Sequence, residues 1–530
     1  MTFDDAIVRA LGNIAAFGDT DVFPFLFERH IFFDLPNESK KLLCDIHDNL
    51  DDWLNDYPPS THESLAQVGY TGFRWATQIE PWWNAYYLAL VVSLAEQIEA
   101  MRIPVEERVI FSYRYAWSES EHKLFGDSTW NDYRKRCVEL AEHAAFVVQT
   151  DISDFYSRIY HHRLENQLKR LPAAGDIPKR VMDLLNKFSR NVSYGLPIGG
   201  PASRILSELA LNSVDRQLRS RRVSFCRYAD DYCVFCDAKS EAYKVLVFLS
   251  EQLFNEGLIL QKSKTRILSA SEFYDTWKLL DPKIEAVTDE EKLLNISIRF
   301  DPYSETPVED YEALSAAVQD VNVVGILARE IGKTAIDTTV TKQAIQAIRV
   351  LDAPAQAGAL RTLLDKENLD VLSPVFVTLM RAVRSLYDDL PDESKGTIDE
   401  ALIRIFDEQQ HILSVELNLA YYLQAISRRH SDRKVEILVD VYDNRPSPIL
   451  RRIIIGAMSN WGCDYWLSDV KRKHASLHEW VKPAMILASY YLTDEGKHWR
   501  DDVKKSWNPM EILTREWFCH RFQTRKDFPT

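Results

Sequence analysis

The pattern of hydrophobic and polar residues divides the chain into three successive regions. Up to about residue 105 the pattern is helical and rich in aromatic residues, and it contains no motif with recognisable chemistry. From there to about residue 300, short β-branched and aromatic runs such as 109–115 and 145–150 alternate with helical stretches, which predicts strands among helices. Beyond about residue 300, apolar residues recur at spacings of three and four, which predicts helix after helix.

Two dipeptides in the last region are typical of helix starts. In Ser373-Pro374 and Ser447-Pro448 the serine can cap a helix and the proline can occupy its first position. Apolar residues at helical spacing follow each pair and form one stripe. Antiparallel helix pairs at this density predict an α-solenoid of irregular HEAT-like repeats, with a plain helical bundle as the alternative.

Two of the predicted strands end at carboxylates. The run 145–150 is followed by Asp151, and the run 223–228 leads to Asp230 and Asp231 before an apolar run resumes. The second arrangement predicts a β-hairpin with two acids at its tip. A single aspartate near a turn is ordinarily a turn residue, but adjacent strands can bring two such sites together.

Three carboxylates on neighbouring strands suit one kind of chemistry. Transfer of a nucleotide to a hydroxyl uses two Mg²⁺ ions about 3.5–4 Å apart, which bridge the attacking and leaving oxygens. Mg²⁺ prefers hard oxygen ligands, so a few carboxylates are what a protein usually supplies. The sequence therefore predicts a site for two Mg²⁺ ions, with Mn²⁺ as a substitute, at Asp151, Asp230 and Asp231.

The distribution of charge supports this interpretation. The chain has 64 Lys and Arg against 79 Asp and Glu, a net charge of -15, which argues against a small basic module that coats nucleic acid. Residues 151–240 nevertheless carry 15 basic against 10 acidic residues, while the rest of the chain carries 49 against 69. The region that holds the acids is thus the basic one, as expected for carboxylates set in a cationic trough for phosphates.

Composition bears on location. Gly is only 17 of 530 residues, well below the usual ~7%, which favours helix. Seven cysteines in so long a chain give no disulfide framework, and the acidic N-terminus lacks the basic region of a signal peptide. The longest apolar run, Ala85–Ala95, is too short to span a bilayer, which needs about 20 residues. We expect a soluble, cytoplasmic protein without membrane contact.

Four motifs resemble those of reverse transcriptases. Asp151–Tyr156 is similar to motif A, Gly195–Ser203 to motif B, Tyr228–Asp231 to the YxDD box of motif C, and Gly257–Thr265 to the lysine-containing motif D. YxDD alone is a weak four-letter signal. All four motifs in the order of the family make a specific one.

The resemblance implies which residues hold the metal ions. It places Asp151 and Asp230 directly on the metals and makes Asp231 the third member of the catalytic set. The same resemblance adds Ile152, the neighbour of Asp151, to the metal site.

The resemblance also implies a nucleotide site. Tyr156 falls where the family has an aromatic steric gate against the 2′-hydroxyl, which implies dNTP substrates. Lys264 is expected near the incoming triphosphate, and Gly199 of motif B lies among the nucleotide-binding residues. Arg114 and Lys123 flank a predicted fingers hairpin and are candidates to hold phosphates. For the three cations an ordinary surface charge is the alternative, and for Tyr156 a core aromatic.

A closer resemblance is to prokaryotic abortive-infection (AbiK-like) and other defence-associated reverse transcriptases. Ser157–Asn166 and Arg204–Asp215 carry it, together with Ile198, which stands where mainstream enzymes have Gln. The group also has a helical-repeat C-terminal half. The resemblance implies DNA synthesis without a conventional template and priming from a tyrosine of the protein. It further implies a single-stranded DNA product, a non-coding RNA partner in some members, and trimers or hexamers of the chain.

The expected architecture is α+β. A reverse-transcriptase fingers–palm fold of the right-hand polymerase type precedes an all-α HEAT-like helical-repeat domain. We expect residues 1–105 to form the helical N-terminal region of the fingers, 106–300 the fingers and palm of the catalytic core, and 301–530 the C-terminal helices.

The leading hypothesis is a DNA polymerase of the reverse-transcriptase type that acts in antiphage defence by abortive infection. One alternative is a conventional RNA-templated reverse transcriptase of a retron or intron, against which Ile198 and the long helical half argue. The other is a non-catalytic scaffold, in which the helical half is the effector and the polymerase fold senses nucleic acid. The complete set of three acids argues against the scaffold.

Overall fold

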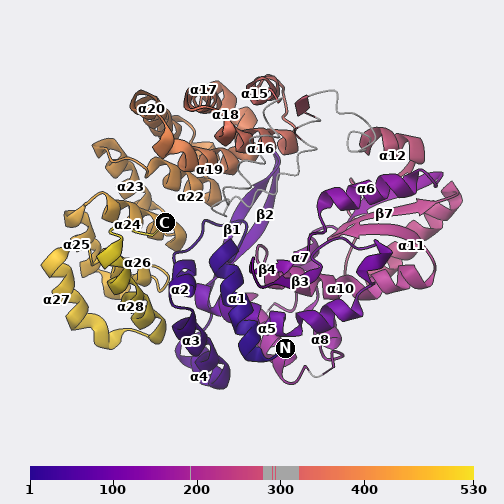
Figure 1. The fold of residues 1–530 in the computed structure, drawn as a ribbon, viewed down its shortest axis with the longest axis horizontal. Coiled ribbons are helices and arrows are strands. Elements are labelled where there is room, and N and C mark those ends of the chain that lie inside the picture. Colours follow the sequence, from indigo (N-terminus) through magenta and orange to yellow (C-terminus); the bar gives the residue numbers. More distant parts are fainter. Residues whose placement is uncertain (173, 191, 278–288, 291–292, 294–320, 530) are drawn as a thin grey trace. The chain divides into compact units, whose positions relative to one another are not determined.

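The structure is a computed structural model that describes residues 1–172, 174–190, 192–277, 289–290, 293 and 321–529. The chain forms two compact units, and each of them is built from three segments (Figure 1). Unit 1 comprises Met1–Asp21, Ser39–His62 and Thr77–Ala286. Unit 2 comprises Val22–Glu38, Glu63–Ala76 and Val287–Thr530.

Unit 1 contains a sheet, a hairpin and many helices. Its helices are α1 (Phe3–Phe17), α4 (Leu50–Asp56), α5 (Pro81–Met101), η1 (Val105–Glu107), α6 (Trp130–Ala141), α7 (Phe155–Arg158), α8 (His161–Leu168), α9 (Ile177–Phe188), α10 (Pro201–Ser220), α11 (Lys239–Asn255) and α12 (Ala270–Trp277). Its strands are β3 (Tyr115–Ser118), β4 (Lys123–Phe125), β5 (Phe146–Asp151), β6 (Ser224–Tyr228), β7 (Asp231–Cys236) and β8 (Arg266–Ser269). The boundary between the units falls within α3 (Pro36–Asp48) and within the strand pair β1 (Thr61–Val68) and β2 (Gly72–Ile79).

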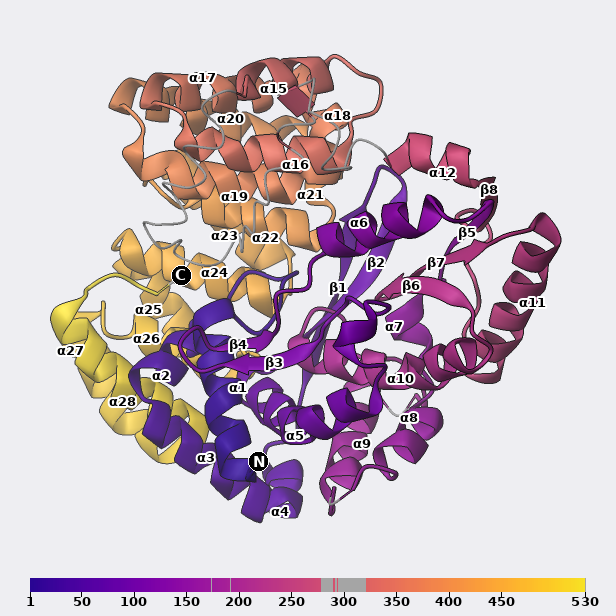
Figure 2. The same ribbon diagram turned by 45° about the vertical axis from the view of Figure 1, so that its right-hand side comes forward.

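The sheet of unit 1 has the strand order β6-β7-β5-β8, and all its neighbours are antiparallel. Side chains of successive residues point to opposite faces of a strand, so each face of this sheet receives its own apolar set. On one face Val147, Cys233 and Phe235 pack in a buried cluster with side chains of α6 and α12. Helix α11 packs against β5 and β7 (Figure 2). The strands expected over 145–150 and 223–235 are confirmed by β5 and by the β6–β7 hairpin.

Two expectations for the region before β5 were wrong. The strand predicted over 109–115 is reduced to an isolated bridge between Ile110 and Arg227, because Tyr113 takes a left-handed conformation (φ 45°) that ends an extended segment. The regular strands of the hairpin are β3 and β4 instead. The first 105 residues are also not wholly helical, since they contain the strands β1 and β2.

Unit 2 is helical over its described residues apart from its part of the β1–β2 pair. Its helices are α2 (Glu28–Asp34), α15 (Val323–Ile331), α16 (Thr338–Ala347), η3 (Ile348–Val350), α17 (Ala353–Leu363), α18 (Lys366–Leu372), η4 (Ser373–Val375), α19 (Phe376–Leu386), η5 (Tyr387–Asp389), α20 (Asp392–Glu408), α21 (Gln410–Leu413), α22 (Glu416–Ile426), α23 (Asp432–Asn444), α24 (Pro448–Asn460), α25 (Asp464–Arg472), η6 (His474–Ser476), α26 (Lys482–Ala488), α27 (Thr493–Val503), η7 (Lys504–Ser506) and α28 (Pro509–Thr524). Ser447 caps α24 as expected, because its side chain accepts from the Leu450 N–H. Ser373-Pro374 instead lies in the 3₁₀ turn η4, and α19 begins at Phe376.

Segments from early in the chain belong to unit 2. The Arg452 guanidinium on α24 donates to both oxygens of Glu28 on α2, at 2.8 and 2.6 Å, and both side chains are buried. The Tyr70 hydroxyl donates to the Val371 carbonyl oxygen at 2.8 Å. No local sequence pattern predicts these contacts, because each joins residues hundreds of positions apart. Within the described residues, no helix combines the length and the apolar character that crossing a membrane requires.

Candidate active site

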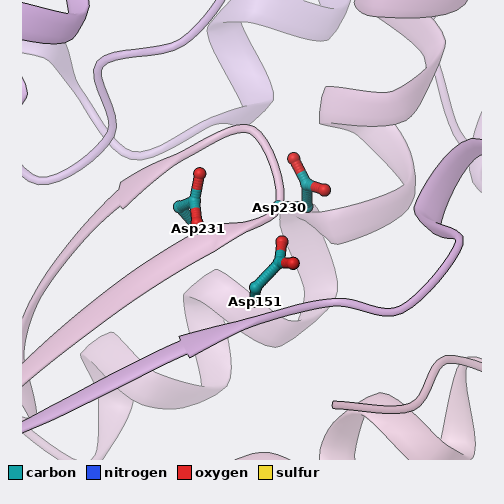
Figure 3. Close-up of side chains that lie close together, drawn as sticks. All are labelled: Asp151, Asp230 and Asp231. Atoms are coloured by element: carbon teal, nitrogen blue, oxygen red, sulfur yellow. The ribbon is translucent and has the colours of Figure 1, made fainter. Parts of the chain in front are cut away.

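Three carboxylates meet at one end of the unit 1 sheet. Asp151 is the last residue of β5, Asp231 is the first residue of β7, and the two are paired across these strands. Asp230 lies in the β6–β7 turn, and one oxygen of each of the three carboxylates lies within 4.8 Å of the others (Figure 3). The structure thus brings together the three acids that the sequence placed at strand ends.

Main-chain hydrogen bonds fix the positions of these acids. The Ile152 N–H donates to the Asp230 carbonyl oxygen at 3.2 Å, and the Gln261 N–H donates to the Asp151 carbonyl oxygen at 2.7 Å. The turn itself is tight, because Tyr228 and Asp231 are paired across it and only Ala229 and Asp230 intervene. Ala229 has φ 51°, a left-handed conformation that costs a residue with a Cβ roughly 1–2 kcal/mol.

The Arg227 guanidinium stabilises this strained turn by hydrogen bonding to its backbone. Arg227 is completely buried, and its Nη1 donates to the Ala229 carbonyl oxygen at 2.8 Å. Its Nε and Nη2 donate to Asp215 on α10 at 2.9 and 2.6 Å, and Nη2 also donates to Glu208 at 2.7 Å. The guanidinium therefore connects helix α10 to the backbone of the β6–β7 turn, which contains Asp230.

The buried ion pairs continue away from the turn. Glu208 also accepts from Arg102 at 2.6 Å and from the Ser112 hydroxyl at 2.5 Å. Arg102 in turn donates to Glu99 at 2.8 Å, and Arg114 pairs with the same carboxylate at 2.6 Å. Burial disfavours the charge of Glu208, but Arg102 and Arg227 hold its pKa below the usual value. We call Arg227, Asp215, Glu208, Arg102, Glu99 and Arg114 the buried arginine network.

The buried arginine network was not predicted from the sequence. One signal was present, since Arg227 interrupts a short strand between apolar neighbours, and a buried arginine is almost always paired. Its partners could not be named from the sequence, because Asp215, Glu208 and Glu99 look like ordinary charges on amphipathic helices.

The carboxylate cluster holds more negative charge than its surroundings neutralise. Burial and the charges of Asp230 and Asp151 raise the pKa of Asp231 to about 7, although Lys264 acts in the opposite direction. The Lys264 ammonium donates to Asp151 at 2.6 Å. Burial works against the ammonium, yet Asp151 and the other two acids keep the pKa of Lys264 above its usual value. Three carboxylates this close together favour a bound cation, because it offsets their repulsion. Carboxylate oxygens are the ligands that Mg²⁺ prefers, so the three acids fit Mg²⁺.

Two of the expected nucleotide-site residues, Tyr156 and Gly199, accept main-chain hydrogen bonds. Tyr156 is on α7, and burial together with the neighbouring Tyr113 raises the pKa of its hydroxyl well above the usual value. Its carbonyl oxygen accepts from the Leu196 N–H at 2.9 Å, which joins motif A to the start of motif B. Gly199 has φ 127°, which residues with a side chain rarely adopt, and its carbonyl oxygen accepts from the Asp21 N–H at 3.2 Å.

The two cations of the expected fingers hairpin differ in placement. Lys123 is on β4, partly exposed, and paired with Glu121 at 2.9 Å. Arg114 is buried in the arginine network and also donates to the Ile103 carbonyl oxygen at 2.9 Å, and burial lowers its pKa. A buried guanidinium that is already paired with Glu99 argues against the phosphate contact expected for Arg114. The hairpin expected between the two cations is confirmed by β3 and β4.

Residues 98–300 match the family model described as reverse transcriptase (RNA-dependent DNA polymerase). The chain therefore carries a reverse-transcriptase domain. The match includes all three acids, and an enzyme with this domain is a nucleotidyltransferase. Among solved structures, telomerase from Candida albicans in complex with the TWJ fragment of telomeric RNA is similar at 12% sequence identity, over 78% of this chain and 68% of that chain, with a TM-score of 0.29. That similarity is too low to support any statement about this chain. A search among curated proteins found no match.

Replacing Arg227 by Lys tests whether the buried arginine network positions the catalytic turn. One ammonium cannot make the forked contacts to Asp215, Glu208 and the Ala229 carbonyl oxygen together. We expect nucleotide incorporation to fall on the order of a hundredfold, since a misplacement of about 1 Å has that effect on catalysis.

The matched control is Arg452→Lys, which changes an equally buried arginine of unit 2 that pairs with Glu28. Both variants should melt at lower temperatures than the wild type, but only Arg227→Lys should lose activity per folded molecule. Equal activity losses in the two variants would make the network a stabilising feature only.

The raised pKa of Asp231 predicts how stability depends on pH. Between its ordinary value of 3.8 and about 7 the folded protein binds this proton more tightly than the unfolded chain, so the Asp231 contribution to stability falls as the pH rises through that window. In buffer with a chelator, Asp231→Asn should therefore melt at a higher temperature than the wild type at pH 8. The difference should shrink as the pH falls toward 4.

Mg²⁺ should reverse this order, because it raises the melting temperature of the wild type at pH 8 more than that of Asp231→Asn. Asp237→Asn is the control, since Asp237 is an exposed acid directly after β7. If the melting temperatures of Asp231→Asn and the wild type change in parallel with pH in chelator, the carboxylates do not repel one another at this site.

Proposed function

We propose that this chain is a DNA polymerase of the reverse-transcriptase type that acts in antiphage defence by abortive infection. The observation that carries the polymerase part is the cluster of Asp151, Asp230 and Asp231 within the region that matches the reverse-transcriptase family. The defence part is supported by the resemblance of Ser157–Asn166 and Arg204–Asp215 to abortive-infection enzymes.

The proposed cofactor is a pair of Mg²⁺ ions, for which Mn²⁺ can substitute. The three carboxylates, with the backbone at Ile152, would hold them. When bound there, the metal ions would supply charge neutralisation and polarisation of the triphosphate during attack by a hydroxyl.

The remaining chemistry is assigned to residues of the chain. The Lys264 ammonium, whose pKa is raised, keeps a proton on Nζ beside Asp151 and is suited to stabilise or protonate the leaving pyrophosphate. The Tyr156 ring excludes a 2′-hydroxyl and so selects dNTPs. Gly199 lets the backbone approach the nucleotide, because any side chain there would be strained. Lys123 on the hairpin is the cation proposed to contact phosphates.

Unit 2 is proposed to act as a HEAT-like helical-repeat domain through which the chain forms a homo-oligomer, a trimer or a hexamer. The supporting observation is the succession of helices between Val323 and Thr524, joined by short turns. The single-stranded DNA product, priming from a tyrosine, a non-coding RNA partner and a cytoplasmic location complete the proposal. They rest on the resemblance alone.

The proposal is tested by incubating the purified chain with labelled dNTPs and Mg²⁺, with and without added RNA. We expect a DNA product from the wild type and none from Asp230→Asn. Loss of the labelled product on protease treatment would support priming by the protein, and its sequence distinguishes untemplated from complementary DNA. No incorporation under any of these conditions would refute the polymerase proposal, and a complementary product would favour a retron-like or intron-like enzyme.

A second prediction concerns the sugar. Tyr156→Ala should incorporate ribonucleotides in place of dNTPs far more readily than the wild type, because the ring that meets the 2′-hydroxyl is gone. The ratio of kcat/KM for dTTP and UTP measures this discrimination. Tyr156→Phe keeps the ring and is expected to keep the discrimination, so a ratio that is the same in all three proteins would rule out the gate.

A further inference from the structure

Unit 1 has a concave surface that does not include the three acids. It is an open pocket of about 440 Å³ between the segment that follows motif A and the end of α11. Arg158, Tyr160 and Arg163 of the first segment and Phe254 and Ile259 of the second are among the residues that line it. Its volume lies within the range of small-molecule sites.

The chemistry of the pocket is cationic and aromatic. Among the described residues that line it, none is acidic, although the whole chain has a net charge of -15. Arg158 has only a loose contact of 3.6 Å with the exposed Asp154, and Arg163 has no acidic partner in the described part of the chain. Arg163 without an acidic partner, next to Arg158 with its single exposed ion pair, suits an anion such as a phosphate.

Two large aromatic rings of the same pocket are exposed to solvent. Phe254 is 74% exposed and Tyr160 is 47% exposed, although rings of this size ordinarily bury most of their surface. Exposed aromatic rings next to cations are the means by which proteins stack the bases and hold the phosphates of single-stranded nucleic acid.

The wall that carries Tyr160 is rigidly built. A Cβ atom at Gly257 would lie 2.0 Å from the Tyr160 ring, so the ring packs directly on the backbone of a residue whose φ is +82°. Tyr160 is also paired with Tyr194 in an isolated bridge, and their rings meet edge to face at 6.3 Å. The Tyr160 ring is therefore held in a fixed place at the edge of the pocket.

The segment that carries Ile259 is joined to the backbone that follows Asp151. The Ser153 N–H, two residues after Asp151, donates to the Ile259 carbonyl oxygen at 2.8 Å. Ile152 and Leu260 form an isolated antiparallel bridge next to it. A ligand in the pocket would thus contact the backbone segment that is hydrogen-bonded to the catalytic strand end.

We infer that this pocket binds a nucleotide unit of a single-stranded nucleic acid, with the base on Phe254 and Tyr160 and the phosphate on Arg158 and Arg163. The inference deepens the proposed polymerase function and rests on it for the nature of the strand. A free dNTP offers the same base and phosphate, and the experiment separates the two sources.

The test measures binding of a fluorescein-labelled oligothymidylate by anisotropy and of dTTP by calorimetry, both with the full chain in EDTA so that the catalytic acids hold no metal. Phe254→Ala should weaken oligothymidylate binding about tenfold, the usual effect of losing one stacking ring. Arg163→Gln should reduce the slope of log affinity against log salt by about 0.7, as expected when one phosphate contact to a single strand is lost.

Two control variants stand outside the pocket. Tyr243→Ala removes another exposed ring of α11, and Arg170→Gln removes another exposed arginine close to α8. Both should bind oligothymidylate like the wild type, and all four variants should melt like it.

The result expected is a loss of oligothymidylate affinity in Phe254→Ala and Arg163→Gln with no change in their binding of dTTP. Loss of dTTP affinity without loss of oligothymidylate affinity would overturn the assignment to a strand in favour of free nucleotide. Unchanged binding of both probes, or equal losses in the control variants, would overturn the site altogether. Because binding is measured without metal, a wild type that binds but does not polymerise would reject the proposed function while leaving the pocket in place.

Discussion

The contact between the Arg227 guanidinium and the Ala229 carbonyl oxygen is the interaction on which the site depends most. Two of the three acids follow directly after Ala229, in a turn whose left-handed residue is unfavourable by itself. Arg227 can be buried completely only because Asp215 and Glu208 balance its charge. Removing one partner of such a pair typically costs about 3–5 kcal/mol, so the network is a strong restraint on the turn.

The restraint explains how three carboxylates can stay close together. Their oxygens lie within 4.8 Å, and the pKa of Asp231 rises to about 7 because the acids repel one another in a buried place. In a flexible turn the carboxylates could move apart, which would relieve this repulsion. A turn held in place by Arg227 keeps the carboxylates close, and their repulsion then favours a divalent cation that enters, while the Lys264 ammonium offsets part of it at Asp151.

The sequence predicted those parts of the fold that depend on local pattern. Apolar runs that end in acids located β5 and the β6–β7 hairpin, and with them the cluster of three carboxylates, because strand period and turn position are encoded within a few residues. The burial of Arg114 and the pairing of Arg227 with Asp215 could not be predicted, since a charge on a helix carries no mark of its distant partner. For the same reason, nothing assigned Glu28 to unit 2, where its partner Arg452 lies more than four hundred positions away.

The most direct test of this account is a crystal structure of the full chain grown with Mn²⁺ and a non-hydrolysable dNTP, with anomalous diffraction data that locate the metal. The account predicts two anomalous peaks about 3.5–4 Å apart, both coordinated by carboxylate oxygens of Asp151, Asp230 and Asp231. It also predicts that the Ala229 carbonyl oxygen remains bonded to Arg227. Ordered nucleotide without metal at these carboxylates, or metal bound by another set of residues, would contradict it.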